Sequence, residues 1–144
     1  MRLIKIYNKG NILKPHLFEE VKKIDTVKFE GHQKDFKVNS DWWCIEKDNI
    51  IIAYCGMTYL KNENAVFLSR AWVDKSYRGQ GLQKRMIKTR LKAAKGYKSA
   101  CTYTVLGNSA SSNSLIKMGF KFYNPMYYFA GKDVIYFIKE LKKS

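Results

Sequence analysis

Proline, glycine and histidine are scarce in this sequence of 144 residues, which holds 2 Pro, 9 Gly and 2 His. Together with 46% hydrophobic residues, the low Pro and Gly content argues against an intrinsically disordered chain. Long hydrophobic runs are also missing, and none approaches the roughly 20 residues that cross a bilayer. The first residues do not have the pattern of a signal peptide. We therefore expect a cytoplasmic protein with no membrane partner.

Cysteine is too rare and too scattered to form a structural framework. The three cysteines, Cys44, Cys55 and Cys101, are odd in number and contain no Cys-x-x-Cys pair, which argues against disulfides. With so few histidines, a zinc site is not expected either, and we predict no metal. The sequence instead predicts buried free thiols in a reducing compartment.

Acidic residues are also scarce. The sequence has 12 acidic and 27 basic residues, which gives a net charge of +15. From Lys75 to Lys132 there is no carboxylate at all, while twelve Lys or Arg occur there. Such a basic segment attracts anions, either a phosphorylated cofactor or nucleic acid. A plain solvated lysine-rich surface is the alternative, and the sequence leaves it open.

Hydrophobic periodicity predicts alternating strands and helices in one domain spanning residues 1–144. We predict strands over 2–7, 41–46, 49–60, 65–73, 100–105, 120–129 and 134–141, and helices over 13–24, 79–95 and 109–118. Residues 25–40 carry no clear pattern and are expected to form a loop or a short helix. Short polar turns join the strands between 41 and 73 into an antiparallel meander.

This order predicts a mixed α/β (α+β) fold, with a mostly antiparallel mixed sheet of about seven strands and helices on both faces. Neighbouring residues of a strand face opposite sides of the sheet. We therefore expect Trp42 or Trp43 to meet solvent, substrate or a partner, unless a helix covers each face.

A phosphate-binding turn is predicted where the strand ending near Val73 gives way to the helix after Gly79. Unpaired N–H groups and the helix dipole favour an anion there. Gly79 and Gly81 allow close approach of a ligand, and Arg78 adds a positive charge. The spacing is neither that of a Walker loop nor Gly-x-Gly-x-x-Gly. A glycine-softened turn before an amphipathic helix is the alternative.

The stretch Arg-Gly-Gln-Gly-Leu-Gln (78–83) resembles the Arg/Gln-x-x-Gly-x-Gly/Ala loop of the GNAT acetyltransferases. A second stretch, Asn-Ser-Ala-Ser-Ser-Asn-Ser-Leu-Ile-Lys-Met-Gly-Phe (108–120), is similar to the family's Asn-x-x-Ala/Ser-x-x-x-Tyr/Leu-x-x-x-Gly-Phe segment. The resemblance covers about residues 40–141. It implies a GNAT-like sheet splayed at an acetyl-CoA site, and an N-acetyltransferase that works by direct attack in a ternary complex.

The resemblance also implies which residues hold acetyl-CoA. Backbone groups of residues 71–73 would run beside the pantetheine arm, and a backbone N–H near Val73 would stabilise the oxyanion. Amides of residues 78–83 would hold the pyrophosphate. The full cofactor-binding set is Ala71, Trp72, Val73, Arg78, Gly79, Gln80, Gly81, Leu82, Gln83, Asn108 and Ser111.

Three positions depart from the family pattern. Gln83 stands where a small residue is usual, Phe67 where some relatives have a carboxylate base, and Leu115 where many have a tyrosine acid. Among the remaining polar residues, Tyr103 and Ser111 are the leading catalytic candidates, although packing and helix capping are the stronger explanation for such residues. His16 and His32 lie outside the recognisable core.

The acceptor amine is not identified by the sequence, and neither a monomer nor a homodimer is excluded. The positive charge disfavours a polycationic acceptor and favours one on an anionic scaffold. The competing hypothesis is a GNAT-fold protein without catalysis that binds nucleic acid through its basic segment, 75–132. A steep salt dependence of binding would distinguish the two.

Overall fold

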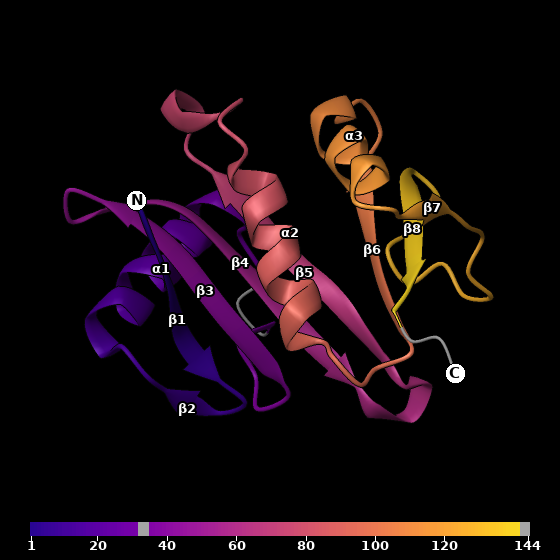
Figure 1. Cartoon of the computed structure of the whole chain (residues 1–144), viewed down its shortest axis with the longest axis horizontal. Coiled ribbons are helices and arrows are strands. Elements are labelled where there is room, and N and C mark those ends of the chain that lie inside the picture. Colours follow the sequence, from indigo (N-terminus) through magenta and orange to yellow (C-terminus); the bar gives the residue numbers. More distant parts are fainter. Residues whose placement is uncertain (32–34, 142–144) are drawn as a thin grey trace.

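The computed structural model describes residues 1–31 and 35–141 and contains one eight-stranded sheet flanked by helices (Figure 1). In chain order the elements are β1 (Arg2–Asn8), β2 (Asn11–Ile12), α1 (Pro15–Lys28), β3 (Ser40–Lys47), β4 (Ile50–Leu60), η2 (Lys61–Glu63), β5 (Ala65–Val73), η3 (Lys75–Tyr77), α2 (Leu82–Ala93), β6 (Ser99–Val105), α3 (Ser109–Lys117), β7 (Lys121–Phe122) and β8 (Val134–Glu140).

The sheet is mixed and mostly antiparallel, as predicted, with the order β2-β1-β3-β4-β5-β6-β8-β7. All neighbouring strands are antiparallel except β5 and β6, which run parallel. The sheet has one strand more than the seven predicted. This additional strand is the two-residue β2, which pairs with the end of β1. A strand this short has no periodicity that a sequence pattern can register.

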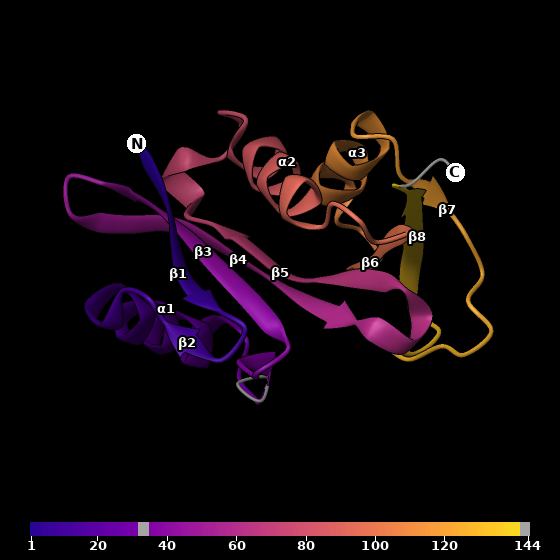
Figure 2. The ribbon, with the colours of Figure 1, turned by 60° about the horizontal axis from the view of Figure 1, so that its bottom comes forward.

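Helices cover both faces of the sheet, α1 on one side and α2 with α3 on the other (Figure 2). Of the two alternatives for Trp42 and Trp43, the one in which a helix covers each face is confirmed, because they are 0% and 4% exposed and neither meets solvent. Trp42 packs in the apolar cluster that includes Phe18 of α1. Trp43 faces the other way, into the cluster that includes Met86 of α2.

Helix α2 follows its sequence pattern closely. Its buried side chains include Leu82, Met86 and Ile87, while Lys84 and Lys88 are exposed. The helix begins three residues later than predicted, because the glycines before it take a left-handed backbone conformation. On the other face, α1 runs to Lys28, four residues beyond the predicted end.

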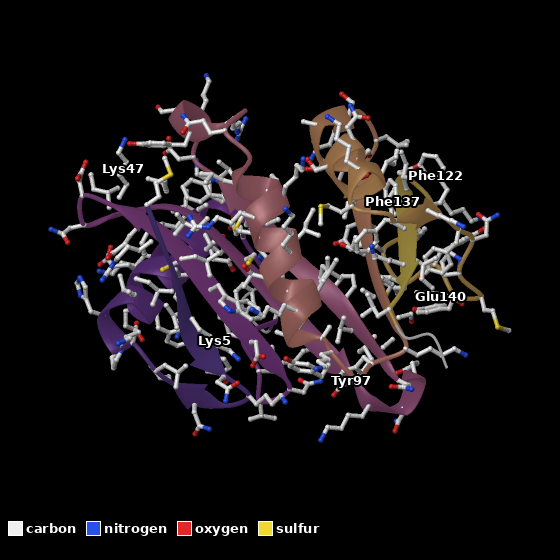
Figure 3. The ribbon with its side chains drawn as sticks, viewed as in Figure 1. Lys5, Lys47, Tyr97, Phe122, Phe137 and Glu140 are labelled. Carbon is white, nitrogen blue, oxygen red and sulfur yellow. The ribbon has the colours of Figure 1, made fainter. Side chains whose placement is uncertain are left out.

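The predicted strand over 120–129 is wrong beyond Phe122, where β7 ends. Phe122 packs on Phe137 of β8, with ring centroids 5.1 Å apart (Figure 3). The following Asn-Pro cannot continue a hydrogen-bonded strand, since proline has no N–H. Residues 123–133 form a loop instead, held where the Tyr136 hydroxyl accepts from the Ala130 N–H and donates to the Gly131 carbonyl.

All three cysteines are buried and free, as predicted. Among the described residues, no helix combines the length and the apolar character needed to span a membrane.

Candidate functional site

Strands β5 and β6 diverge from their paired ends (Figure 1), and the candidate site is the cleft lined by residues of both strands and of α2 and α3. β5 and β6 pair over only three residues each, ending at Phe67 and Cys101. One residue further, the Thr102 hydroxyl donates to the Leu68 carbonyl (2.8 Å). Beyond this link lie two adjoining cavities, an inner one of about 360 Å³ and an outer one of about 790 Å³.

The backbone of β5 turns hydrogen-bonding groups toward this cleft. The Asp74 N–H donates to the Ile52 carbonyl (2.7 Å), and the β4–β5 register runs without a shift back to the Gly56–Arg70 pair. Hydrogen-bonded pairs alternate along an antiparallel ladder. N–H and C=O groups of Arg70 therefore face β4, while those of Ala71 and Val73 face away from it, toward β6.

The turn between β5 and α2 forms the mouth of the cleft. Gly79 and Gly81 have φ values of 79° and 80°, which non-glycine residues rarely adopt, and a Cβ atom on either would meet nothing within 4 Å. No side chain caps the start of α2, and its first turn has no acidic residue. Arg78 reaches back to the Val73 carbonyl through its Nε (3.3 Å). Open amides, a helix dipole and a cation thus meet at one point.

Most of the predicted cofactor residues line these cavities. The outer cavity is lined by Ala71, Trp72, Val73, Arg78, Gly79, Gly81, Leu82, Gln83, Asn108 and Ser111. Gln80 is exposed and lines neither cavity. Asn108 caps α3 by accepting from the Ser111 N–H (3.2 Å). Asn108, and not Ser111, is therefore the cap of α3, and the Ser111 side chain lines the cleft.

The two catalytic candidates, Tyr103 and Ser111, both line the inner cavity. Tyr103 lines the inner cavity, with its ring stacked on Phe67 (centroids 6.0 Å apart). Leu115 lines the same cavity and is buried. His16 is exposed at the start of α1 and lines neither cavity, and His32 lies outside the described residues.

Cys101 is not placed to react. Its thiol is buried and donates to the Val66 carbonyl (3.6 Å). Burial raises the pKa of Cys101 to about 11, so the thiol is neutral at physiological pH.

A buried ion network behind the cleft was not predicted. Arg70 binds Asp25 through Nε (2.7 Å) and Asp35 through Nη1 (3.1 Å), and the Tyr54 hydroxyl donates to Asp25. Burial opposes the charge on Arg70, but the hydrogen bond and charge of Asp25 outweigh it and raise the pKa of Arg70. The network ties α1 to β4 and β5 across 45 residues of sequence, a distance over which no local pattern operates.

Two further residues of the inner cavity, Arg90 and Ser69, were also missed. Arg90 is 2% exposed, and the Ser69 hydroxyl oxygen is buried with no hydrogen-bond partner in the described part of the chain. A signal for Arg90 was present, because it lies one helical turn after Met86 on the apolar side of α2. Over residues 1–31 and 35–141, no three His, Cys, Asp or Glu gather into a metal site.

Comparison with known proteins agrees with this geometry. The Acetyltransferase (GNAT) family matches residues 9–120, a range that starts earlier than the resemblance in the sequence. No curated protein matches.

Solved structures share the fold at low sequence identity. A GNAT-family acetyltransferase from Staphylococcus aureus Mu50 has a TM-score of 0.73 and 20% identity over 98% of this chain and 99% of its own. An aminoglycoside 6'-acetyltransferase type Ii has a TM-score of 0.77 and 13% identity over 100% and 99%. A putative streptothricin acetyltransferase from Bacillus anthracis, solved with acetyl coenzyme A, has a TM-score of 0.61 and 24% identity over 72% and 64%.

Proposed function

The chain belongs to the acetyltransferase (GNAT) family, and we propose that it is an acetyl-CoA-dependent N-acetyltransferase whose cofactor occupies the cleft between β5 and β6. One observation carries the proposal. The N–H and C=O groups of Ala71 and Val73 face a cleft that leads to the uncapped start of α2. An extended, amide-rich arm ending in phosphates matches both features.

The cofactor is proposed to lie along the cleft from mouth to floor. Its pyrophosphate sits at the amides of residues 78–83, where Arg78 adds charge. Its pantetheine arm pairs with the edge of β5 at Ala71 and at the Val73 N–H, since the Val73 carbonyl already accepts from Arg78. Ser111, which lines both cavities, lies beside the thiol end. The thioester then reaches the inner cavity, next to Thr102.

The reaction is nucleophilic attack by the neutral amine on the thioester carbonyl carbon. A C–N bond forms and the carbonyl oxygen gains a negative charge. The C–S bond then breaks, CoA leaves as a thiolate, and the amine proton passes to solvent or a base. We propose that the Ala71 N–H donates a hydrogen bond to the oxyanion. The resemblance implied an N–H near Val73 for this role, but β5 and β6 already diverge after Leu68, so the cleft reaches deeper, to Ala71.

Proton transfer in this protein cannot use the carboxylate base and the tyrosine acid that some relatives have. Phe67 and Leu115, at those two positions, cannot exchange protons. Tyr103 and Ser111 are the hydroxyl groups that we propose for proton transfer, since both line the inner cavity.

The acceptor is proposed to be an amine that is not a polycation. Asp25 and Asp35, the carboxylates behind the cleft, already bind Arg70. A polycation would therefore meet a protein of net charge +15 with these carboxylates engaged. The buried free thiols are in keeping with a cytoplasmic location.

The proposal is tested by following free CoA thiol while acetyl-CoA is mixed with small amines, peptides with a free N-terminus or lysine, and amine-bearing RNA bases. We expect transfer to at least one acceptor class, and its loss in Gly81→Glu, which puts a carboxylate at the start of α2. Gly96→Glu is the matched control, since Gly96 has the same open surroundings and a left-handed φ of 99° beyond the other end of α2. Equal activity in the two variants would argue against the site.

A further inference from the structure

Arg90 is a buried cation with no anion to balance it. Arg90 is 2% exposed. Its hydrogen bonds go to three backbone carbonyls: Nε to Met86 (3.2 Å), and Nη1 to Gly56 (3.2 Å) and Arg70 (2.9 Å). Within the described residues, no carboxylate lies in ion-pair distance of it. Burying an unpaired charge is costly, and a protein that keeps one commonly uses it.

The neighbouring Arg70 shows the usual arrangement for comparison. Arg70 has Asp25 and Asp35 as counterions, whereas burial lowers the pKa of Arg90 without a carboxylate to offset it. Arginine nevertheless stays protonated at neutral pH. Arg70 binds Asp25 of α1 on one face of the sheet, whereas Arg90 belongs to α2 on the other face. Of these two arginines, only Arg90 has no carboxylate partner among the described residues.

Arg90 is joined to the cleft by a single peptide group. Its Nη1 holds the carbonyl of Arg70, which points toward β4. In a trans peptide, the N–H of the next residue points the opposite way, so the Ala71 N–H points toward β6 and into the cleft. A cation on the carbonyl oxygen polarises the peptide, and its N–H becomes a stronger donor.

The rest of the guanidinium faces the same place. Arg90 lines the inner cavity, and its Nη2 makes no hydrogen bond to any described residue. The inner cavity begins where the Thr102–Leu68 bond ends the contact between the strands. An arm that enters from α2 ends there, so its acyl group comes closest to Arg90.

We propose that Arg90 stabilises the negative charge that forms on the acyl carbonyl oxygen during transfer. It acts as a positioning residue, through the polarised Ala71 N–H and the field of its own buried charge. The oxygen carries a full negative charge when the C–N bond has formed, and returns that electron pair to carbon as the C–S bond breaks. The inference rests on the proposed acetyl-CoA site.

The competing explanation is purely structural, because Arg90 also satisfies carbonyls beside the register shift between Gly56 and Thr58. A structural role needs the N–H donors of Arg90, whereas the proposed role needs its charge. The two are separated by Arg90→Gln, which keeps an N–H donor without a charge, and by Arg90→Lys, which keeps the charge.

The test uses binding, so it needs no knowledge of the acceptor. S-carboxymethyl-CoA carries a carboxylate one bond beyond the position of the acetyl carbonyl, so it places a negative charge beside the site of the oxyanion, and S-carbamoylmethyl-CoA is its neutral amide counterpart. Calorimetry on the wild-type protein is expected to show about 10-fold tighter binding of the carboxylate, a preference of about 1.4 kcal/mol. Arg90→Gln should lose the preference and Arg90→Lys should keep most of it. Arg78→Gln, at the mouth, should weaken both ligands equally.

The outcomes separate this inference from the function on which it rests. If neither analogue binds the wild-type protein, the acetyl-CoA site itself is wrong. If both bind with equal affinity, the site stands and the role of Arg90 is overturned. The wild-type comparison decides this even if Arg90→Gln does not fold, and a preference that persists in a folded Arg90→Gln would also overturn it.

Discussion

At the scale of single residues, Gly56 packs closely against the indole of Trp42. The two are partners in the β3–β4 register, and a Cβ atom on Gly56 would lie 2.7 Å from the ring. Trp42 is itself fully buried and stacks on Phe36, so it has no room to retreat. This contact explains a glycine in the middle of a strand, where its flexibility is a disadvantage.

Gly56→Ala should therefore lower the free energy of unfolding by about 1–3 kcal/mol, the usual cost of overpacking a core. Urea denaturation followed by tryptophan fluorescence would measure it. Ser69→Ala on β5 is the control, expected to be neutral or slightly stabilising, because it removes a buried hydroxyl that has no partner. A neutral Gly56→Ala would show that Trp42 is not fixed as described.

The three thiols give a prediction about pH. Burial raises the pKa of Cys44 to about 12 and of Cys101 to about 11, and raises that of Cys55, from an ordinary 9.0. A pKa raised in the folded state adds stability below pH 9, which is lost as the pH rises from about 9 to 11 or 12. The Cys101→Ala variant should therefore lose less free energy of unfolding between pH 9 and 11 than the wild-type protein does. In a separate test at pH 8, the thiols of the native protein should hardly react with Ellman's reagent until denaturant is added. Fast labelling of the native protein would contradict this burial.

Particular residues show which parts of the site can be predicted from the sequence and which cannot. The loop glycines and Arg78 were predicted because consecutive positions carry their signal. Asp25 and Arg70 were not, because their contact exists only once α1 and β5 meet. Arg90 was counted among the basic residues of its segment, although its place on the apolar side of α2 distinguished it.

At the scale of elements, α2 combines an apolar face with an unusual row of like charges. Lys84, Lys88 and Lys92 are exposed at four-residue spacing, and none forms an ion pair with any residue of 1–31 or 35–141. Like charges at this spacing destabilise a helix. Repulsion within this row of lysines lowers the stability of α2, and a bound anionic ligand would reduce that repulsion.

Lys88→Glu should raise the stability of the protein, by about 0.5–1 kcal/mol, because it places a carboxylate between two lysines. Thermal denaturation at low salt would show the gain, and high salt should reduce it. The control is Lys23→Glu on α1, where the present pair with Glu20 (3.5 Å) would be lost and a small decrease is expected. A drop in stability for Lys88→Glu would mean that the row has a partner within the chain.

Elements with strong local patterns were predicted well, and irregular ones were not. The meander β3–β4–β5 and helices α2 and α3 follow from periodicity and turn residues. The loop over 123–133 resembles a strand in sequence because it is rich in aromatics. It is irregular because Pro125 has no N–H for a strand hydrogen bond, and because Tyr123 and Tyr128 pack on Tyr136. The divergence of β5 and β6 was expected from the family resemblance alone, because the sequence of each strand is ordinary.

At the scale of the whole molecule, the net charge of +15 makes long-range attraction of anions a general property. Single-stranded RNA should bind at 50 mM salt, with an affinity that falls roughly 50-fold at 200 mM if about four phosphates are contacted. Fluorescence anisotropy with labelled RNA would measure this, and Lys84→Glu with Lys88→Glu should flatten the slope. Absent or salt-insensitive binding would contradict an anionic scaffold for the acceptor.

The central claim is that the cleft between β5 and β6 binds acetyl-CoA at the uncapped start of α2. The most direct measurement is isothermal calorimetry of acetyl-CoA with the wild-type protein, Gly81→Glu and Gly96→Glu. The account predicts micromolar binding that is lost in Gly81→Glu and kept in Gly96→Glu. No binding to the wild-type protein, or unchanged binding to Gly81→Glu, would contradict it.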